Sequence, residues 1–153
     1  MAVGLAIAPV TPRPDVLVDE SGRLALSSKR VAKFDAGFWL RRDGSADSAP
    51  WDEDADALTC DSLGCRYVAG DGTVFALDFD SRALAEDCAR SDVLVSAVPV
   101  RSRCLGPDLV IDRFDLWRDG AHAFWSQGEG RVRVDSVRER RGARPWVAER
   151  GFR

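Results

Sequence analysis

Two short runs, Asp92-Val93-Leu94-Val95-Ser96 and Leu109-Val110-Ile111-Asp112, decide the fold class of this chain. Each run is almost purely apolar and is closed by polar residues, a pattern typical of strands that are covered on both faces. We expect the two runs to form the centre of a sheet. With short helices around it, this sheet indicates an α/β fold.

Two hairpins are predicted ahead of these strands. The first joins residues 15–18 and 23–26 around a turn that contains glycine. The second joins residues 66–68 and 73–77 around Ala69-Gly70-Asp71-Gly72, where the Asp-Gly pair favours a tight turn. The β-forming residues in these runs indicate antiparallel pairing.

The segments between the strands are predicted to be helical or irregular. Residues 33–42 place apolar side chains on one helical face, and residues 43–61 carry seven acids and no basic residue, as in an exposed loop. Ser81 is expected to cap a short helix that includes Cys88. A further turn of helix is predicted over residues 113–118.

The last predicted elements are a pair of strands over residues 121–125 and 131–134. Arg and Val alternate in the second strand. Because side chains on a strand alternate between its two faces, these arginines are predicted to share one side that faces solvent.

Composition places the chain among ordinary soluble globular proteins of one domain. It has 153 residues, of which 45% are hydrophobic and 31% charged. The net charge is only −3, but residues 1–126 carry 14 Lys and Arg against 21 acids, whereas residues 127–153 carry 8 Arg against 4 acids. The basic charge is therefore concentrated at the C-terminal end.

The first residues are apolar but too few to cross a membrane alone. Residues 2–8 are followed at once by Pro9, whereas about 20 apolar residues are needed to span a bilayer. They are either a mobile terminus, or residues 1–12 are the trailing end of a membrane helix or a linker. We expect one domain over residues 13–147 and a disordered tail over residues 148–153.

Several blocks of the sequence occur together, in this order, in a known family. The most specific is Ile111-Asp-Arg-Phe-Asp-Leu-Trp-Arg-Asp-Gly-Ala-His-Ala-Phe-Trp125. The blocks resemble the C-terminal domain of ComEC, the inner-membrane DNA-uptake channel of natural competence, in its alphaproteobacterial form. The others are Arg13-Pro-Asp-Val-Leu-Val18, Gly22-Arg-Leu-Ala-Leu-Ser27, Phe38-Trp-Leu-Arg-Arg-Asp-Gly44, Cys60-Asp-Ser-Leu-Gly-Cys65, Ala83-Leu-Ala-Glu-Asp-Cys-Ala-Arg90, Asp92-Val-Leu-Val-Ser96, Cys104-Leu-Gly-Pro107, Arg131-Val-Arg-Val134 and Arg141-Gly-Ala-Arg-Pro-Trp146.

The resemblance implies a reduced metallo-β-lactamase-like αββα sandwich with mixed sheets and short helices. It also implies that a membrane helix precedes the domain, that the domain faces the periplasm, and that its partners are the channel part of the same protein and the competence machinery. Other members of the family carry a metal-nuclease motif of the form H-x-H-x-D-H. This chain has a single histidine and no such motif, so we expect neither that catalysis nor a metal or other cofactor.

Four cysteines, Cys60, Cys65, Cys88 and Cys104, allow three disulfide connectivities. Pairing Cys60 with Cys65 and Cys88 with Cys104 is the simplest of these. A periplasmic location, which the resemblance implies, would permit both bonds. Reduced thiols or a zinc site are the alternatives, and the irregular spacing argues against zinc.

Three residues are candidates for chemistry. Asp92 and Asp112 border the predicted central strands, where α/β proteins often place functional groups, and the lone His122 lies on a predicted strand. Together they could form an unusual carboxylate and histidine site of an active metal-dependent nuclease that degrades the non-transported strand. The alternatives are that Asp112 caps the following helix and that His122 is a structural residue bonded to the backbone.

The basic C-terminal segment is a candidate surface for single-stranded DNA. Guanidinium groups pair with phosphates, and an aromatic ring can stack on a base. The alternative is a solvated edge strand whose charges prevent aggregation. The candidate residues are Arg131, Arg133, Arg138, Arg140, Arg141, Arg144 and Trp146.

Overall fold

The computed structural model describes two kinds of segment. Residues 57–101 and 104–142 are described in full, together with Arg41 and Gly44. Ahead of them, the backbone of four strands is described: β1 (Gly4–Ile7), β2 (Pro14–Val18), β3 (Leu24–Leu26) and β4 (Ala49–Pro50).

The protein is a mixed α/β protein with a five-stranded mixed sheet and a few short helices. The order of this sheet is β5-β6-β7-β8-β9, in which β5, β6 and β7 are antiparallel neighbours and β7, β8 and β9 are parallel. Its strands are β5 (Leu58–Cys60), β6 (Gly64–Val68), β7 (Val74–Asp78), β8 (Val93–Ser96) and β9 (Leu109–Ile111).

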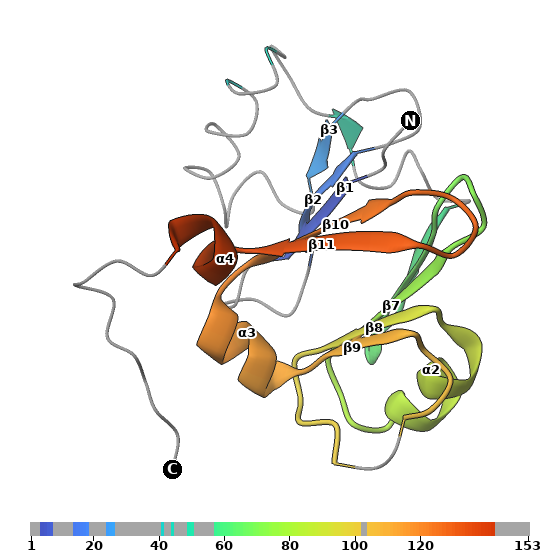
Figure 1. Ribbon diagram of the computed structural model, residues 1–153. Coiled ribbons are helices and arrows are strands. Elements are labelled where there is room, and N and C mark those ends of the chain that lie inside the picture. The colour runs from blue at the N-terminus through green and yellow to red at the C-terminus, as the bar shows by residue number, and fades with distance from the viewer. Residues whose placement is uncertain are drawn as a thin grey trace.

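A second sheet has the order β11-β10-β1-β2-β3-β4 (Figure 1). The hairpin of β10 (His122–Ser126) and β11 (Val132–Ser136) forms one end of it, and β1 lies between β10 and β2. The N-terminal and C-terminal parts of the chain therefore meet in one sheet.

The main core lies where β10 packs on the five-stranded sheet. Phe124 of β10 is completely buried, and its ring meets that of Phe75 of β7 edge-on, with 6.2 Å between the ring centroids. Burying one such ring contributes roughly 1.5–3 kcal/mol. The other buried members of this core are Leu58, Cys65, Tyr67, Ala69, Leu77, Val93, Val95 and Leu116.

Three short helices complete the described fold (Figure 1). Helix α2 (Leu84–Arg90) packs through Leu84 on the outer face of the five-stranded sheet, against Ala76 and Leu94. Helices α3 (Arg113–Asp119) and α4 (Val137–Arg141) contact each other, and α3 follows β9 directly. No helix of the described segments has the length and apolar character needed to cross a bilayer.

The connection from β8 to β9 crosses the same outer face beside α2. Val98 and Val100 of this connection pack with Leu94, and Gly106 lies against the end of α2. A Cβ atom on Gly106 would lie 1.9 Å from the carbonyl oxygen of Cys88, so only glycine permits this approach.

Most of the strands that the sequence predicts are confirmed. Both predicted hairpins form, as β2–β3 and β6–β7, and the final pair of strands forms β10–β11. The predicted helix over residues 113–118 is α3. Helix α4 was not predicted from the sequence.

Several predictions were wrong. Strand β9 lies at the edge of its sheet and not at its centre. It is apolar because both of its faces are covered: Leu109 and Ile111 pack on the main core, and Val110 packs on the cluster of Ala76, Leu84 and Leu94 under α2. Ser81 does not cap a helix, because α2 begins only after Ala83 and has no side-chain cap. Part of the predicted loop over residues 43–61 forms β4 and β5.

The expectation for residues 1–12 also needs correction. Gly4–Ile7 pairs with both β10 and β2, so these residues form a strand within a sheet and not the end of a helix or a linker. Their register places Ile7 opposite His122. The predicted helix over residues 33–42, apart from Arg41, and the predicted tail over residues 148–153 lie outside the described residues.

Candidate nucleic-acid interface

The hairpin of β10 and β11 separates apolar and basic side chains onto its two faces. Phe124 and Val134 are opposite each other and face the core, whereas the next pair, Trp125 and Arg133, faces outward. The two strands are joined through Glu129, which has a positive φ of 56° between two glycines. The prediction that Arg131 and Arg133 share one solvent-facing side is therefore confirmed.

Arg133 stacks on Trp125. The guanidinium carbon lies 4.2 Å from the centroid of the indole ring, within the range of a cation–π contact. The Arg133 side chain is still 51% exposed. The pair thus presents a flat, positively charged surface to solvent, of the kind on which a nucleobase can stack.

Arg131, directly before β11, extends this surface. Its guanidinium group pairs with the carboxylate of Glu129 at 3.4 Å, and the two side chains are 70% and 86% exposed. An exposed ion pair of this kind is worth little, so a phosphate can compete for the guanidinium group. We call the outward side of the hairpin, comprising Trp125, Arg131 and Arg133, the arginine face.

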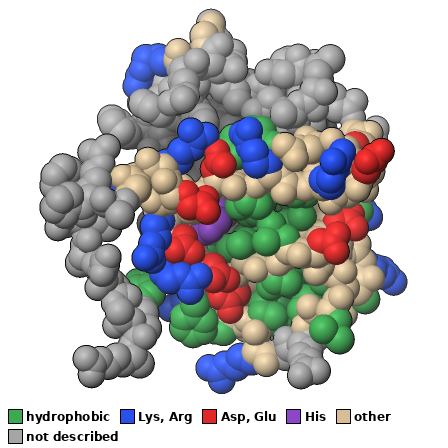
Figure 2. Space-filling view, viewed as in Figure 1, with side chains coloured by type: hydrophobic (Ala, Val, Ile, Leu, Met, Phe, Trp, Pro, Cys, Tyr) green, Lys and Arg blue, Asp and Glu red, His purple; other side chains and the backbone are tan. Residues whose placement is uncertain are grey.

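Acids limit the arginine face at the end next to α4. Asp135 accepts a hydrogen bond from Arg140 at 2.5 Å and lies 4.0 Å from Arg133. Residues 122–142 contain five arginines and three acids, whereas residues 57–121 contain seven arginines and eleven acids. Figure 2 shows the resulting alternation of blue and red side chains on this side of the molecule. The surface is basic but interrupted.

The remaining arginine candidates lie on or beyond α4. This helix begins with a capping box in which Ser136 and Glu139 bond each other's backbone N–H groups. Arg138 pairs with Asp119 of α3 at 3.5 Å, so it ties two helices together. Arg141 also lies on α4, next to Arg140. The residues predicted beyond it, Arg144 and Trp146, lie outside the described residues.

Asp92 and Asp112 lie at opposite ends of the parallel strands. Asp92 precedes β8, and its carboxylate accepts a hydrogen bond of 2.8 Å from the backbone N–H of Val74. Asp112 follows β9 and caps α3 by accepting from the backbone N–H groups of Phe114 and Asp115. Both carboxylates hold the fold together, and the structure does not bring them together as a site.

His122 has a structural environment. It is 4% exposed on β10, and its Nδ1 donates a hydrogen bond of 2.9 Å to the carbonyl oxygen of Gly120. Its ring stacks beside that of Phe124 at 6.3 Å. Within the described residues, no three His, Cys, Asp or Glu side chains are grouped so that they could hold a metal ion.

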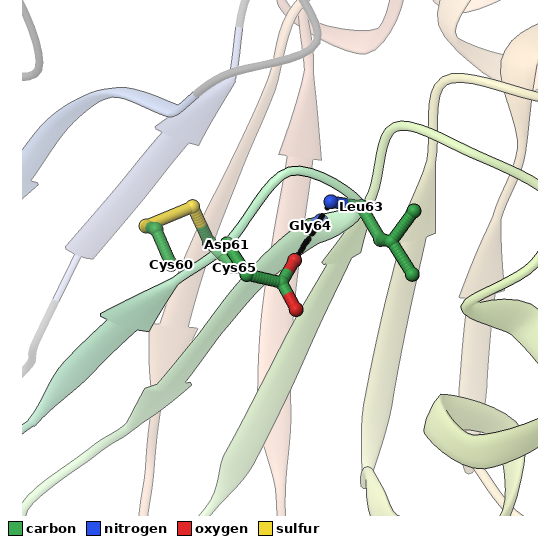
Figure 3. The surroundings of a disulfide bond; sticks show 5 residues. All are labelled: Cys60, Asp61, Leu63, Gly64 and Cys65. Atoms are coloured by element: carbon green, nitrogen blue, oxygen red, sulfur yellow. Dashed lines mark hydrogen bonds between the residues drawn. A yellow bond between two sulfur atoms is a disulfide. The ribbon is translucent and has the colours of Figure 1, made fainter.

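Both disulfides have the simplest of the three connectivities. Cys60 and Cys65 face each other across β5 and β6, with their Cα atoms 4.0 Å apart. Figure 3 shows how the turn between them is closed, with the Asp61 carboxylate accepting from the backbone N–H groups of Leu63 and Gly64. Cys88 of α2 bonds Cys104 of the β8–β9 connection, with Cα atoms 5.3 Å apart. All four cysteines are paired.

The comparisons with known proteins assign this chain to no family. No family model, no curated protein and no solved structure matches it. The arginine face must therefore be interpreted from its own chemistry.

Two groups that the structure singles out are not evident from the sequence. Trp125 was part of a predicted strand, but its contact with Arg133 depends on the register of β10 and β11. Asp78 ends β7 and is 1% exposed. Burial, together with the neighbouring carboxyl group of Asp87, raises the pKa of Asp78 to about 8. A carboxyl group at the end of a strand is common, and only the position of α2 reveals that this one is buried.

Proposed function

We propose that this chain is an accessory domain of an inner-membrane DNA-uptake channel, in which it guides the incoming single strand and does not cut DNA. The arginine face carries the proposal, and the resemblance to the C-terminal domain of the ComEC family supports it. The mixed sheet with α2 on its outer face is compatible with the metallo-β-lactamase-like sandwich that this resemblance implies.

The chemistry of the arginine face suits a single strand better than a duplex. Arg131 supplies a phosphate contact, and the stacked pair of Trp125 and Arg133 offers a flat surface to an unpaired base. Bases within a duplex are already stacked and paired, so they cannot use this surface. Because every base has a flat face, such binding does not depend on sequence. That property suits a channel that accepts any DNA.

The disulfides favour a periplasmic position for the domain. Disulfides persist in oxidising compartments such as the bacterial periplasm and are rare in the cytosol. The partners of the domain would then be the membrane-spanning part of the channel and other components of the competence machinery. A domain with this task needs no cofactor.

A nuclease site formed by Asp92, Asp112 and His122 has no support from the geometry. The two carboxylates are at opposite ends of the sheet, and the histidine belongs to the other sheet. General acid–base catalysis needs groups within hydrogen-bonding reach of one substrate atom. We therefore retain the binding function alone.

Binding of a fluorescently labelled, mixed-sequence single strand tests the proposal. We expect the unmodified protein to raise the anisotropy of the label at low salt, and the double variant Arg131→Ala, Arg133→Ala to bind at least about tenfold more weakly, as loss of two phosphate or stacking contacts predicts. The matched control is Arg82→Ala, Arg90→Ala, which removes two exposed, ion-paired arginines near the opposite sheet. Equal losses in both double variants would contradict the proposal.

A further inference from the structure

A buried carboxyl group lies beneath helix α2. Asp78 is the last residue of β7, and its side chain points to the outer face of the sheet, the same face as Ala76 and Leu94, which α2 covers. It is 1% exposed, less than any other acid of the described residues. An ionised carboxylate at such a depth is costly unless donors surround it.

Asp78 has no donor to stabilise its charge. Neither of its carboxylate oxygens accepts a hydrogen bond from an N–H or O–H group of the described residues. The group within reach is the carboxyl of Asp87 on α2, which is itself an acceptor when ionised. Two carboxyl groups in contact can form a hydrogen bond only when they share a proton, so one of them must stay protonated for α2 to close over the strand.

The other polar groups around the pair are already engaged or face solvent. On β8, the Ser96 hydroxyl, in register with Asp78, donates to the Val98 carbonyl at 2.8 Å. Next to Asp78, Asp80 accepts two hydrogen bonds from the Arg82 guanidinium, and on α2 Arg90 pairs with Glu86. Two more arginines belong to packed elements but are exposed and form no ion pair with the two acids: Arg66 of β6 and Arg101 of the β8–β9 connection.

The two ends of α2 are held differently. At its C-terminal end, Cys88 is bonded to Cys104, and Gly106 packs against the backbone of Cys88. At its N-terminal end, Leu84 packs on the sheet, and the backbone N–H of Ala83 donates to the carbonyl oxygen of Asp80. Asp87 directly precedes Cys88, so its contact with Asp78 lies beside the disulfide, whereas the rest of α2 is held on the sheet by noncovalent contacts.

We propose that Asp78 and Asp87 form a pH-sensitive latch, which holds α2 on the sheet in mildly acidic solution through a shared proton and lets the helix lift from the sheet, still tethered by its disulfide, when that proton is lost. Lifting exposes the apolar cluster of Ala76, Leu84 and Leu94. The latch is independent of DNA binding, since it lies on the opposite sheet from the arginine face.

The direction of the pH effect follows from the raised pKa of Asp78. The closed state holds its proton up to about pH 8, whereas an exposed aspartate loses its proton near pH 4. Opening therefore releases a proton between these limits. Stability of the closed state is complete below about pH 4, falls as the pH rises toward 8, and levels off above it, with up to about a tenfold increase in opening per pH unit.

Hydrogen exchange of the α2 backbone amides in the unmodified 153-residue chain tests the latch. After correction for the intrinsic rate, we expect their protection to fall at least about tenfold between pH 5.5 and pH 8, while the amides of β8 keep theirs. Asp78→Asn removes the buried carboxyl group and with it the need for a shared proton, so α2 protection in this variant should be independent of pH; Asp87→Asn leaves Asp78 buried and should only weaken the pH dependence. The matched control is Asp80→Asn, which should behave like the unmodified protein. Equal pH dependence in α2 and β8, or in all the variants, would overturn the proposal.

A second measurement does not depend on how the variants fold. The infrared spectrum of the unmodified protein at pH 7 should contain the carbonyl band of a protonated carboxyl group, which disappears as the pH is raised past about 8. A spectrum at pH 7 with only ionised carboxylates would overturn the latch.

Discussion

Arg133 lies directly opposite Trp125 in the hairpin of β10 and β11, and its guanidinium carbon is 4.2 Å from the centre of the indole ring. This contact holds a long side chain flat on the outside of the sheet. It converts a strand with alternating Arg and Val into a surface of defined shape.

Replacing Trp125 by Leu should weaken the binding of single-stranded DNA much more than it lowers the stability of the fold. The variant keeps an apolar side chain on the strand but removes the ring, so the free energy of unfolding should fall by only about 0.5–1 kcal/mol. Affinity for a single strand should fall by roughly tenfold, because stacking contributes about 1–3 kcal/mol per base. Urea unfolding and anisotropy measure the two effects. Full affinity in the folded variant would rule out base stacking at this position.

Asp112→Ala should weaken the fold through the loss of a helix cap. The carboxylate accepts hydrogen bonds from the backbone N–H groups of Phe114, Asp115 and Val100. Loss of an N-cap costs about 1–2 kcal/mol of unfolding free energy. Asp112→Asn keeps an acceptor oxygen, so it should retain most of the stability. If the two variants are equally stable, the capping role assigned to Asp112 is wrong.

The turns of two hairpins are joined through Asp71, and this contact depends on pH. Partial burial opposes ionisation of its carboxyl group, but hydrogen bonds from Ser126, Thr73 and Gly128 prevail and lower the pKa of Asp71 to about 2. A lowered pKa means that the carboxylate stabilises the fold above about pH 4 and that this contribution is lost as the pH falls toward 2.

Asp71→Asn should therefore lower stability at pH 7 and much less at pH 2. Loss of the charged acceptor should cost about 1 kcal/mol or slightly more at pH 7. Urea unfolding at several pH values measures the difference, and Asp108→Asn, which replaces an exposed acid, serves as the control. An equal cost at both pH values would show that the charge of Asp71 does not contribute.

The two disulfides should contribute unequally to stability. Replacing Cys88 and Cys104 together by serine opens a link between residues 16 apart, whereas Cys60 and Cys65 are only 5 apart. The loop-entropy estimate is about 3 kcal/mol for the longer link and about 2 kcal/mol for the shorter one. Urea unfolding of the two double variants compares them. A larger loss for Cys60 and Cys65 would contradict this order.

The sequence predicted which segments form strands and turns better than it predicted where each strand lies in its sheet. The Asp-Gly pair at Asp71 and the alternation of Arg and Val in β11 are local patterns. The structures they predicted, a hairpin and a strand with its arginines on one side, were both confirmed. An apolar run such as β9 is equally compatible with a central strand and with an edge strand that is covered on both faces. Likewise, residues 4–7 contain no local signal that they enter a sheet beside β10, because that pairing joins distant parts of the chain.

The candidate site was predicted only in part for the same reason. The arginines of β11 are evident from the alternation, but Trp125 joins them through a cross-strand register. Catalytic sites often contain aspartate and histidine, the residue types of Asp92, Asp112 and His122. In this structure each of the three forms a hydrogen bond with the backbone, and the three do not meet at one site. Residue type is visible in a sequence, whereas distance between strand ends is not.

The salt dependence of single-strand binding tests the central claim most directly. If Arg131 contacts a phosphate while Arg133 forms the stacking surface with Trp125, the logarithm of the binding constant should fall linearly with the logarithm of salt concentration, and the double variant Arg131→Ala, Arg133→Ala should reduce the magnitude of this slope by about 0.7, the value for one phosphate contact of a single strand. We predict that reduction, with an unchanged slope for Arg82→Ala, Arg90→Ala. Absence of binding by the unmodified protein at low salt, or an unchanged slope in the variant of the arginine face, would contradict the account.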